Sequence, residues 1–576
     1  MDIFLWGVVG IIQACFLPGV FLAGLFMRGA HWFIFIPVAF CLSLLSNYIL
    51  VMLLVILGFY TKSTMLTIVC IEFVTILYLY KKGKPSNLSY KESLKDTPRT
   101  LFDLLVQCFL FVAVAWSFWI FFKSLGNVFT GWDAVVSWNR WAASWGNNKL
   151  PVLVWNYPQL LPILMSIPYV LMKRVDIELF SYAINALFLP VSFIYLYSLK
   201  LCPPVRLGAI GCLVAVYFFI KKIGVFQSIG HADIPIMLLA LSSLISMLHW
   251  KHSGYKLHFL AISIAFACLS SLTKQAGLFL ILMIHIYLIA EVKGKSTVVP
   301  AKQFILLLAS SLIIVAPWYI YVRYNIQYNG WDSEIKYVTQ GIHQSRTYLE
   351  RIVYAFGHWR ELGVCALLSA LCLLWKEIRA FAFIGVSYYL VWALFFSYDL
   401  RNVALALPFI GLSIGFLVEK CLHFRTSIKE IQSGTSKISN HKPVVACILA
   451  FAFLIMGDNI DKLVEKRNYN RQIERGLGKE MNLKILEVTG MYNEKLLSRI
   501  QYIPYIPGFN KEQYVLVHTP EMFCKKGSTL HKFYGVIETP VKDSYISCLN
   551  DEYHTKVIFE SAGFEFILFQ EKKPTD

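Results

Sequence analysis

Long apolar runs alternate with short polar stretches along the chain as far as about residue 457. A helix needs about 20 apolar residues to cross the hydrocarbon core of a bilayer, and most of these runs approach that length. The pattern therefore predicts a mainly α-helical, polytopic membrane protein with about 14 spans. The expected spans cover about 2–27, 32–59, 63–80, 101–122, 176–199, 207–229, 232–250, 257–273, 276–292, 303–322, 361–375, 380–397, 403–420 and 443–457.

One further apolar run, 158–172, does not fit this pattern. It is short for a span and contains Pro162 and Pro168, which disfavour a regular helix interior. We interpret it as a juxtamembrane or re-entrant helix that stays on the outer side of the membrane. That choice sets the orientation of every later span.

Basic residues are concentrated in two loops between the apolar runs. The first loop contains Lys81, Lys82, Lys84, Lys91, Lys95 and Arg99, and the second runs from Lys420 to Lys442. With 158–172 outside, both loops fall on one side, which the positive-inside rule assigns to the cytoplasm; Lys221 and Lys222 are exceptions. The formal net charge of +18 thus reflects membrane topology, and no nucleic-acid partner is expected.

The composition changes at about residue 460, where charged residues mix with short β-like runs. Tyr514–His518 (YVLVH) and Phe564–Gln570 (FEFILFQ) are typical of strands, and the stretch near Glu480–Ile500 is typical of a helix. We therefore expect a small C-terminal soluble α/β domain outside the cytoplasm. Cys524 and Cys548 lie in this domain and could form a disulfide there, because oxidising compartments preserve such bonds.

Asp133 is the first candidate for chemistry. It lies in Gly131–Pro162, a stretch whose many tryptophans are typical of the membrane–water interface. A carboxylate placed there could accept a proton from an attacking hydroxyl or help to hold a divalent cation, or it could be an ordinary solvated loop acid. Arg140 follows seven positions later, about two helical turns, so both side chains could face one cleft.

A second acid and a histidine occur in GHADIP, residues 230–235. Asp233 begins an expected span, where it either stabilises the helix N-terminus or contributes a second carboxylate to the cavity. His231 beside it is a weaker candidate.

Three cations are also candidates for binding a phosphate. Lys274, in LTKQAG, is surrounded by apolar residues, so its ammonium must reach the membrane surface, pair, or meet an anion such as a lipid phosphate. Arg323 and Arg401 could line the same phosphate site, although Asp399 is close enough in sequence to pair with Arg401 instead. No Walker loop, GxGxxG turn, zinc-type Cys/His spacing or nucleophile elbow occurs, so nucleotide-driven transport and covalent serine chemistry have no sequence signal.

Taken in order, these motifs resemble those of the GT-C glycosyltransferases, and most closely the lipid A aminoarabinose transferases and protein O-mannosyltransferases. The block WDAVVSWNRWA is followed by YPQLLP, GHADIP, LTKQAG and APWYIYVR. The resemblance covers about 101–420. It implies a GT-C-like fold, a polyisoprenyl-phosphate sugar donor and an inverting direct transfer on the outer or luminal face.

Carried over by position, the resemblance implies catalytic roles for Asp133 and Asp233. It implies that Lys274, Arg140 and Arg401 bind the phosphate. The expected phosphate- and substrate-binding set also includes Arg323, His231 and Tyr157. Ala134 stands where a second acid often follows the aspartate, which leaves open whether a divalent cation, Mg²⁺ or Mn²⁺, binds at Asp133 and Asp233. No other cofactor is expected.

The expected organisation has three parts. Residues 1–100 hold N-terminal transmembrane helices beyond those of the resemblance, together with the first basic loop. Residues 101–459 form the GT-C-like catalytic domain, with 131–172 as its outer juxtamembrane loop, and 460–576 form the extracytoplasmic α/β domain.

The expected function is that of an integral membrane hexosyl- or pentosyltransferase acting on a glycan, lipid or protein acceptor of the cell envelope. A bacterial inner membrane is the expected location, with the active site outside the cytoplasm. A ligase or polymerase of lipid-linked glycans is the alternative within enzymes. A secondary transporter or flippase is less favoured, because such proteins usually show internal hydropathy symmetry and this chain has none.

Overall fold

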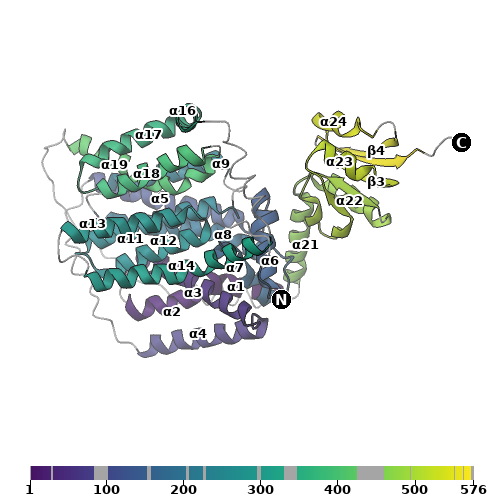
Figure 1. The fold of residues 1–576 in the computed structure, drawn as a ribbon. Coiled ribbons are helices and arrows are strands. Elements are labelled where there is room, and N and C mark those ends of the chain that lie inside the picture. The colour runs from purple at the N-terminus through teal and green to yellow at the C-terminus, as the bar shows by residue number, and fades with distance from the viewer. Residues whose placement is uncertain are drawn as a thin grey trace. The chain divides into compact units, whose positions relative to one another are not determined.

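The computed structural model describes residues 2–27, 30–82, 101–151, 157–202, 206–224, 229–294, 300–329, 347–397, 399–423, 459–492, 494–549, 552–561 and 563–572. The expected last span, 443–457, and most of both basic loops lie outside these residues. The chain forms two compact units (Figure 1). Unit 1 comprises Met1–Leu125 and Trp141–Gly457, and unit 2 comprises Gly126–Arg140 and Asp458–Asp576. The Asp133 segment therefore groups with the C-terminal part of the chain, whereas the expected boundaries assign it to 101–459, as part of the outer juxtamembrane loop 131–172.

Unit 1 is built from apolar helices that follow the expected runs closely. They are α1 (Asp2–Cys15), α2 (Leu17–Phe26), α3 (Trp32–Ile56), α4 (Lys62–Lys82), α5 (Leu101–Ser124), α7 (Leu160–Met172), α8 (Leu179–Tyr197), α9 (Arg206–Ile223), α11 (Asp233–His252), α12 (Leu257–Thr273), α13 (Gly277–Gly294), α14 (Ala301–Asn329), α16 (Tyr348–His358), α17 (Arg360–Leu371), α18 (Arg379–Phe395) and α19 (Leu407–His423).

Eight helical segments in the described residues are long and apolar enough to cross a membrane, or nine if the bent pair Tyr348–Gly357 and Arg360–Leu374 is one span. The prediction of a mainly helical, multi-pass membrane protein is confirmed, but the count of about 14 spans is not. Some expected spans are shorter apolar helices of 10–17 residues, such as α12 and the segment Gly277–Ala290 of α13. The short run 158–172 forms α7, whose 13 residues are all buried.

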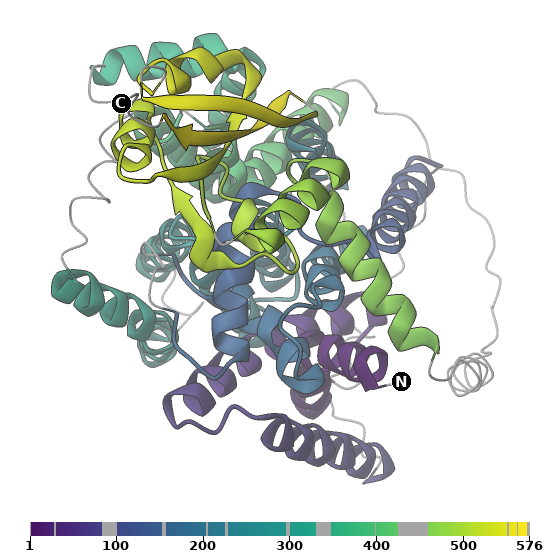
Figure 2. The ribbon, with the colours of Figure 1, turned by 90° about the vertical axis from the view of Figure 1, so that its right-hand side faces the viewer.

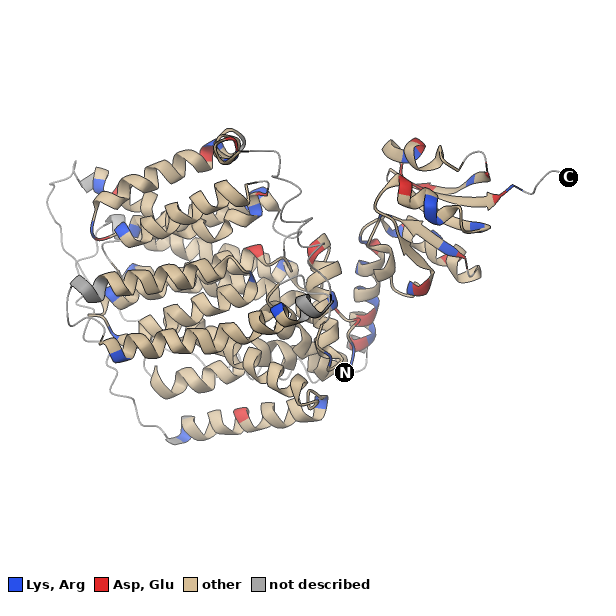
Figure 3. Ribbon diagram, in the orientation of Figure 1, with Lys and Arg blue, Asp and Glu red and all other residues tan. Residues whose placement is uncertain are grey.

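The helices of unit 1 differ in how much they face lipid. The apolar windows of α8 and α11 are entirely buried inside the protein, whereas that of α4 is 6% buried and carries exposed side chains such as Phe73 and Val74. Such an outer surface is stable only in a hydrocarbon solvent. Lys and Arg gather near the ends of the helices in unit 1, leaving their middles largely uncharged (Figure 3).

Close backbone packing between α9 and α19 holds one side of unit 1 together. A Cβ on Gly211 would lie 2.0 Å from the carbonyl oxygen of Gly411, and a Cβ on Gly415 would lie 2.1 Å from that of Leu207. Small residues allow this approach, as in many membrane helix pairs. The contact matters for the site because α19 directly follows the 3₁₀ helix η5 (Leu400–Ala406).

The C-terminal part of unit 2 is a five-stranded sheet in the order β2-β1-β3-β5-β4. Figure 2 shows β3 to β5 in yellow. Its strands are β1 (Lys495–Ser498), β2 (Tyr514–Leu516), β3 (Lys532–Glu538), β4 (Tyr553–Ser561) and β5 (Phe564–Glu571). Strand β1 is parallel to β2 and β3, and β5 is antiparallel to β3 and β4. The predicted small α/β domain is thus confirmed.

Alternating side chains on the central strands build a core on each face of the sheet. Tyr534 and Val536 of β3 pack with α22 (Lys479–Met491), while Phe533 and Ile537 point to the opposite core with α23 (Pro520–Gly527) and α24 (Lys542–Ile546). Cys524 and Cys548 form a disulfide on the latter side, with their Cα atoms 6.1 Å apart.

The helix expected near Glu480–Ile500 is wrong beyond Met491. The chain leaves α22 there and forms β1, whose Leu496 and Leu497 are both buried, one in each core. Pairing with β2 and β3 on both sides determines this conformation, and such pairing has no local sequence signal.

Candidate functional site

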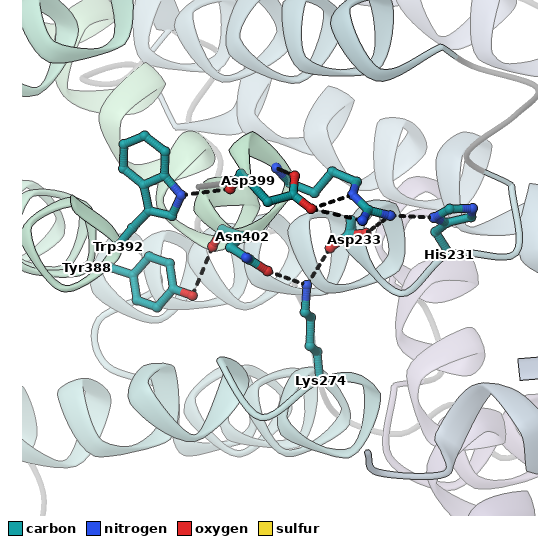
Figure 4. A network of polar contacts seen from close by, with 8 residues as sticks. His231, Asp233, Lys274, Tyr388, Trp392, Asp399 and Asn402 are labelled. Atoms are coloured by element: carbon teal, nitrogen blue, oxygen red, sulfur yellow. Dashed lines mark hydrogen bonds and ion pairs between the residues drawn. The ribbon is translucent and has the colours of Figure 1, made fainter. Parts of the chain in front are cut away.

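A polar network joins three helix ends inside unit 1 (Figure 4). Asp233 is the first residue of α11, Lys274 ends α12, and Arg401 and Asn402 lie on η5. These helix ends supply the polar groups because the middles of the same helices are apolar. The network thus brings together residues from distant parts of the sequence.

Lys274 has two side-chain partners in the network. Its Nζ lies 2.6 Å from Oδ1 of Asp233 and donates to Oδ1 of Asn402 at 2.8 Å. The Lys274 and Asp233 side chains are 16% and 6% exposed. Burial by itself would lower the pKa of Lys274, but the adjacent carboxylate outweighs it, so that pKa is raised above its usual range and the ammonium is retained.

Arg401 connects Asp233 with two further groups. Its Nη2 lies 2.8 Å from Oδ2 of Asp399, and its Nη1 lies 4.0 Å from Oδ2 of Asp233. The same Nη1 donates to Nδ1 of His231 at 3.0 Å. Because a guanidinium has only donors, Nδ1 is the acceptor and a neutral His231 carries its proton on Nε2.

Two side chains of α18 fix the conformation of η5. Tyr388 donates its hydroxyl to the carbonyl oxygen of Asn402 at 3.1 Å, and the indole of Trp392 donates to the carbonyl oxygen of Asp399 at 3.0 Å. Asp399 also accepts from the backbone N–H of Arg401 at 2.9 Å. The guanidinium is therefore held in one orientation by its own loop and by α18.

The charges of this network are balanced between Lys274, Arg401, Asp233 and Asp399. Arg401 is 35% exposed and is the more accessible of the two cations. The guanidinium of Arg401 is thus more open to an anionic ligand than the ammonium of Lys274. Fixed cations with little water around them stabilise negative charge strongly.

Tyr157 and Arg323 are the two remaining members of the expected substrate-binding set in unit 1. Tyr157 contributes electrostatically to the pKa of Lys274, and its carbonyl oxygen accepts from the indole of Trp318 at 3.1 Å. Arg323 is exposed on α14, beside a shallow hollow that includes Tyr319 and Tyr324.

Asp133 and Arg140 lie in unit 2. Asp133 precedes a π-helical turn, Ala134–Asn139, a conformation often found at functional sites. Arg140 donates a hydrogen bond to the hydroxyl of Tyr505. Burial raises the pKa of Tyr505, while the neighbouring charge of Arg140 opposes that change.

Trp138, Trp141 and Trp145 do not form the exposed belt suggested by their interfacial pattern. Trp141 and Trp145 are buried, and the Trp145 indole donates to Oε1 of Gln159 at 3.1 Å. The ring of Trp141 lies 6.1 Å from that of Tyr157, so these residues link α6 (Arg140–Gly146) to the YPQLLP stretch inside unit 1.

The described residues contain no group of three or more His, Cys, Asp and Glu side chains arranged to hold a metal ion. The carboxylate of Asp233 already contacts Lys274. Among the described residues, no set of carboxylates is thus arranged around a position for a divalent cation.

Sequence reasoning identified five members of the network or its surroundings and missed three. His231, Asp233, Lys274, Arg401 and Tyr157 were predicted, and the pairing of Asp399 with Arg401 was foreseen as an alternative. Asn402, Tyr388 and Trp392 were not selected. Asn402 follows Arg401 directly in YDLRN and could have been noticed, whereas Tyr388 and Trp392 lie in an apolar helix where aromatic residues are common.

No protein-family model and no curated protein match the chain. Among solved structures, the chain is similar to "Crystal Structure of ArnT from Cupriavidus metallidurans bound to Undecaprenyl phosphate", with 12% sequence identity, a TM-score of 0.48, and coverage of 80% of this chain and 98% of that one. The same protein in the apo state matches with 12% identity, a TM-score of 0.47, and coverage of 80% and 97%. With TM-scores below 0.5 and 12% identity, these matches support no conclusion about the family of this chain, and the resemblance indicated by the sequence stays a prediction.

Proposed function

We propose that the protein is a membrane glycosyltransferase that moves a sugar from a polyisoprenyl phosphate to an acceptor hydroxyl. The observation that carries the proposal is the network in which Asp233 and Asp399 hold Lys274 and Arg401 at the ends of apolar helices. Ionisable groups buried in a membrane protein are costly, and they usually mark a substrate or ion site.

The chemistry of sugar transfer calls for this arrangement of cations. The donor is a phosphodiester with one negative charge. When the bond to the anomeric carbon breaks, the polyisoprenyl phosphate leaves as a phosphomonoester and gains a second negative charge. Arg401, supported by Lys274, would stabilise the added charge without reorganising during the reaction. The acceptor oxygen attacks the anomeric carbon from the opposite face, so the configuration inverts.

The attacking hydroxyl must lose a proton, and Asp133 is the base that we assign to this step. A carboxylate accepts that proton as the new glycosidic bond forms. Asp233 is less suited to the task because Lys274 and Arg401 favour its charged form. We therefore assign Asp233 to holding the cations.

The outer side of a bacterial inner membrane is the proposed location of the chemistry. Helix α11 has Asp233 at its start and Lys251 and His252 at its end, and Lys256 precedes α12. The positive-inside rule assigns the basic end to the cytoplasm and hence Asp233 and Lys274 to the outer side. The disulfide between Cys524 and Cys548 is likewise typical of an oxidising compartment.

The direct test is transfer by the purified protein in liposomes. The donors to compare are polyprenyl-phosphate monosaccharides and a polyprenyl-pyrophosphate oligosaccharide, and release of the polyprenyl product reports turnover even when water is the acceptor. We expect turnover of a monosaccharide donor by the wild type and its loss in Asp133→Asn, with unchanged membrane insertion. Wild-type turnover in Asp133→Asn would disprove the assigned base.

Two other outcomes would change the proposed function. Turnover of the pyrophosphate-linked oligosaccharide alone would identify a glycan ligase or polymerase, and no turnover across a full panel of sugars would reject a transferase. Repeating the assay with EDTA, and then with added Mg²⁺ or Mn²⁺, tests the divalent cation that the sequence left open.

A further inference from the structure

The backbone just before Asp133 is held by side chains of the C-terminal domain. Arg467 Nε donates to the carbonyl oxygen of Gly126 at 2.8 Å, and the Tyr502 hydroxyl donates to that of Thr130 at 3.1 Å. Between them, Arg475 Nη1 donates to the carbonyl oxygen of Phe129 at 3.3 Å. Three carbonyl groups within five residues thus accept hydrogen bonds from one domain.

Arg475 is the most enclosed of these donors. Its residue is only 7% exposed, and its Nη2 donates to the carbonyl oxygen of Tyr505 at 2.9 Å. A single guanidinium therefore joins the Asp133 segment to the 3₁₀ turn Ile503–Tyr505. The planar group fits this task because it offers several donors in fixed directions.

The local sequence keeps Arg475 in place. It directly follows α21 (Asn459–Glu474), and Nδ2 of Asn482 donates to the carbonyl oxygens of both Ile473 and Arg475 at 2.8 Å. Gly476 has a φ of +74°, which allows the chain to turn at once toward α22. The guanidinium of Arg475 thus extends from the end of α21, where the side chain of Asn482 holds the backbone.

Contacts on both sides of Asp133 involve Tyr502 and the 3₁₀ turn Ile503–Tyr505 that follows it. The Trp132 and Tyr502 rings meet edge to face, with centroids 5.4 Å apart, and Arg140 donates to the Tyr505 hydroxyl. Gly126 permits the approach at the start of the segment, because a Cβ there would lie 2.4 Å from Arg467 Nε and φ is +75°. The contacts extend from Gly126 to Arg140, with Asp133 between them.

We propose that the C-terminal domain presents the Asp133 segment, with Arg475 as its main positioning residue and Arg467 and Tyr502 as supports. This rests on the proposed function, in which Asp133 is the base. The domain then takes part in the transfer step itself, because a carboxylate must be held within a fraction of an ångström of its working geometry. Arg475 acts through Asp133 and contacts no reacting atom in this scheme.

The test compares Arg475→Gln with Arg471→Gln in the full-length protein. Arg471 lies about one turn earlier, on α21, but is exposed and pairs with Glu474 at 3.5 Å, so it is a matched control. The two readouts are kcat and KM for the donor, and hydrogen–deuterium exchange of the peptide 126–140. Arg475→Gln should lower kcat at least about tenfold with KM within about twofold, and should speed exchange before Asp133.

The control and a conservative variant separate positioning from general damage. Arg471→Gln should leave both readouts within about twofold of wild type, as expected for an exposed side chain. Tyr502→Phe removes one hydrogen bond while keeping the ring beside Trp132, and should give a smaller loss of kcat with the same melting temperature. If Arg475→Gln does not fold, Tyr502→Phe and Arg467→Gln together carry the test.

Unchanged exchange in a folded Arg475→Gln protein, or exchange that rises while kcat stays at the wild-type value, would overturn the proposal. Wild-type kcat and wild-type hydrogen–deuterium exchange in both Tyr502→Phe and Arg467→Gln would also overturn it. The proposed function can fail separately. If Asp133→Asn keeps full turnover while Arg475→Gln loosens the segment, the structural contact stands and the assignment of Asp133 as the base is wrong.

Discussion

The ammonium of Lys274 lies 2.6 Å from Oδ1 of Asp233, although 41 positions separate the two residues. Both side chains are largely buried, and each is the nearest opposite charge that the other contacts. A buried ion pair of this kind adds little net stability, because desolvation offsets most of the attraction, but removing one partner is costly. Substitutions at Lys274 and Asp233 can therefore separate the effect of the pair on stability from its effect on function.

Lys274→Met should leave the Asp233 carboxylate with much less compensation in an apolar surrounding. We expect unfolding free energy to fall by about 3–5 kcal/mol, as for other broken buried pairs, together with loss of transfer. Thermal melting of the detergent-solubilised protein and the liposome assay measure the two effects. The double variant Lys274→Met/Asp233→Leu should recover most of the stability but none of the transfer. Recovery of transfer would show that the pair is only structural.

Arg401→Lys should retain the charge but lose the fork that contacts Asp399 and His231 together. We expect turnover to fall by about a hundredfold or more, as when one preorganised electrostatic donor is removed. Arg379→Lys, at an exposed position on α18, should remain within about twofold of wild type. Equal turnover in the two variants would remove Arg401 from the proposed phosphate site.

Gly211→Ala should disturb the contact between α9 and α19, the helix that directly follows η5. The new Cβ would lie 2.0 Å from the Gly411 carbonyl oxygen, so the helices must separate. A loss of about 1–3 kcal/mol in stability is expected from such overpacking, with reduced turnover because Arg401 moves with η5. Gly24→Ala on α2 is the control, since nothing lies within 4 Å of its added Cβ. Equal melting temperatures for the two variants would contradict the packing seen here.

Cys524→Ser should release Cys548 as a free thiol. Under denaturing, non-reducing conditions the variant would then label with one more maleimide than the wild type, because two paired cysteines are replaced by one free cysteine. One label fewer would mean that the wild-type pair is reduced. Opening a loop closed over a separation of 24 residues should also lower stability by about 3 kcal/mol. Thermal melting with and without reductant checks the second effect.

The sequence determined which stretches become helices in unit 1, because the apolar runs that predict spans are local properties of the chain. It also indicated that Lys274 must reach the membrane surface, pair or meet an anion, and that Asp399 could pair with Arg401, since burial of an unpaired charge is costly wherever it occurs. Strands Tyr514–Leu516 and Phe564–Glu571 were likewise visible as short β-branched or aromatic runs.

Only the tertiary structure decided which groups meet. The partner of Lys274 is the carboxylate of Asp233. Asn402, which is 128 positions from Lys274 in the sequence, joins this pair because η5 packs against α11. Likewise, the sequence predicts Arg140 as a phosphate ligand, and only the structure shows that its side chain donates to Tyr505 and that the segment before Asp133 accepts a hydrogen bond from Arg475. Apolar periodicity specifies a helix from neighbouring residues, whereas these contacts depend on how separate elements pack, which no local pattern encodes.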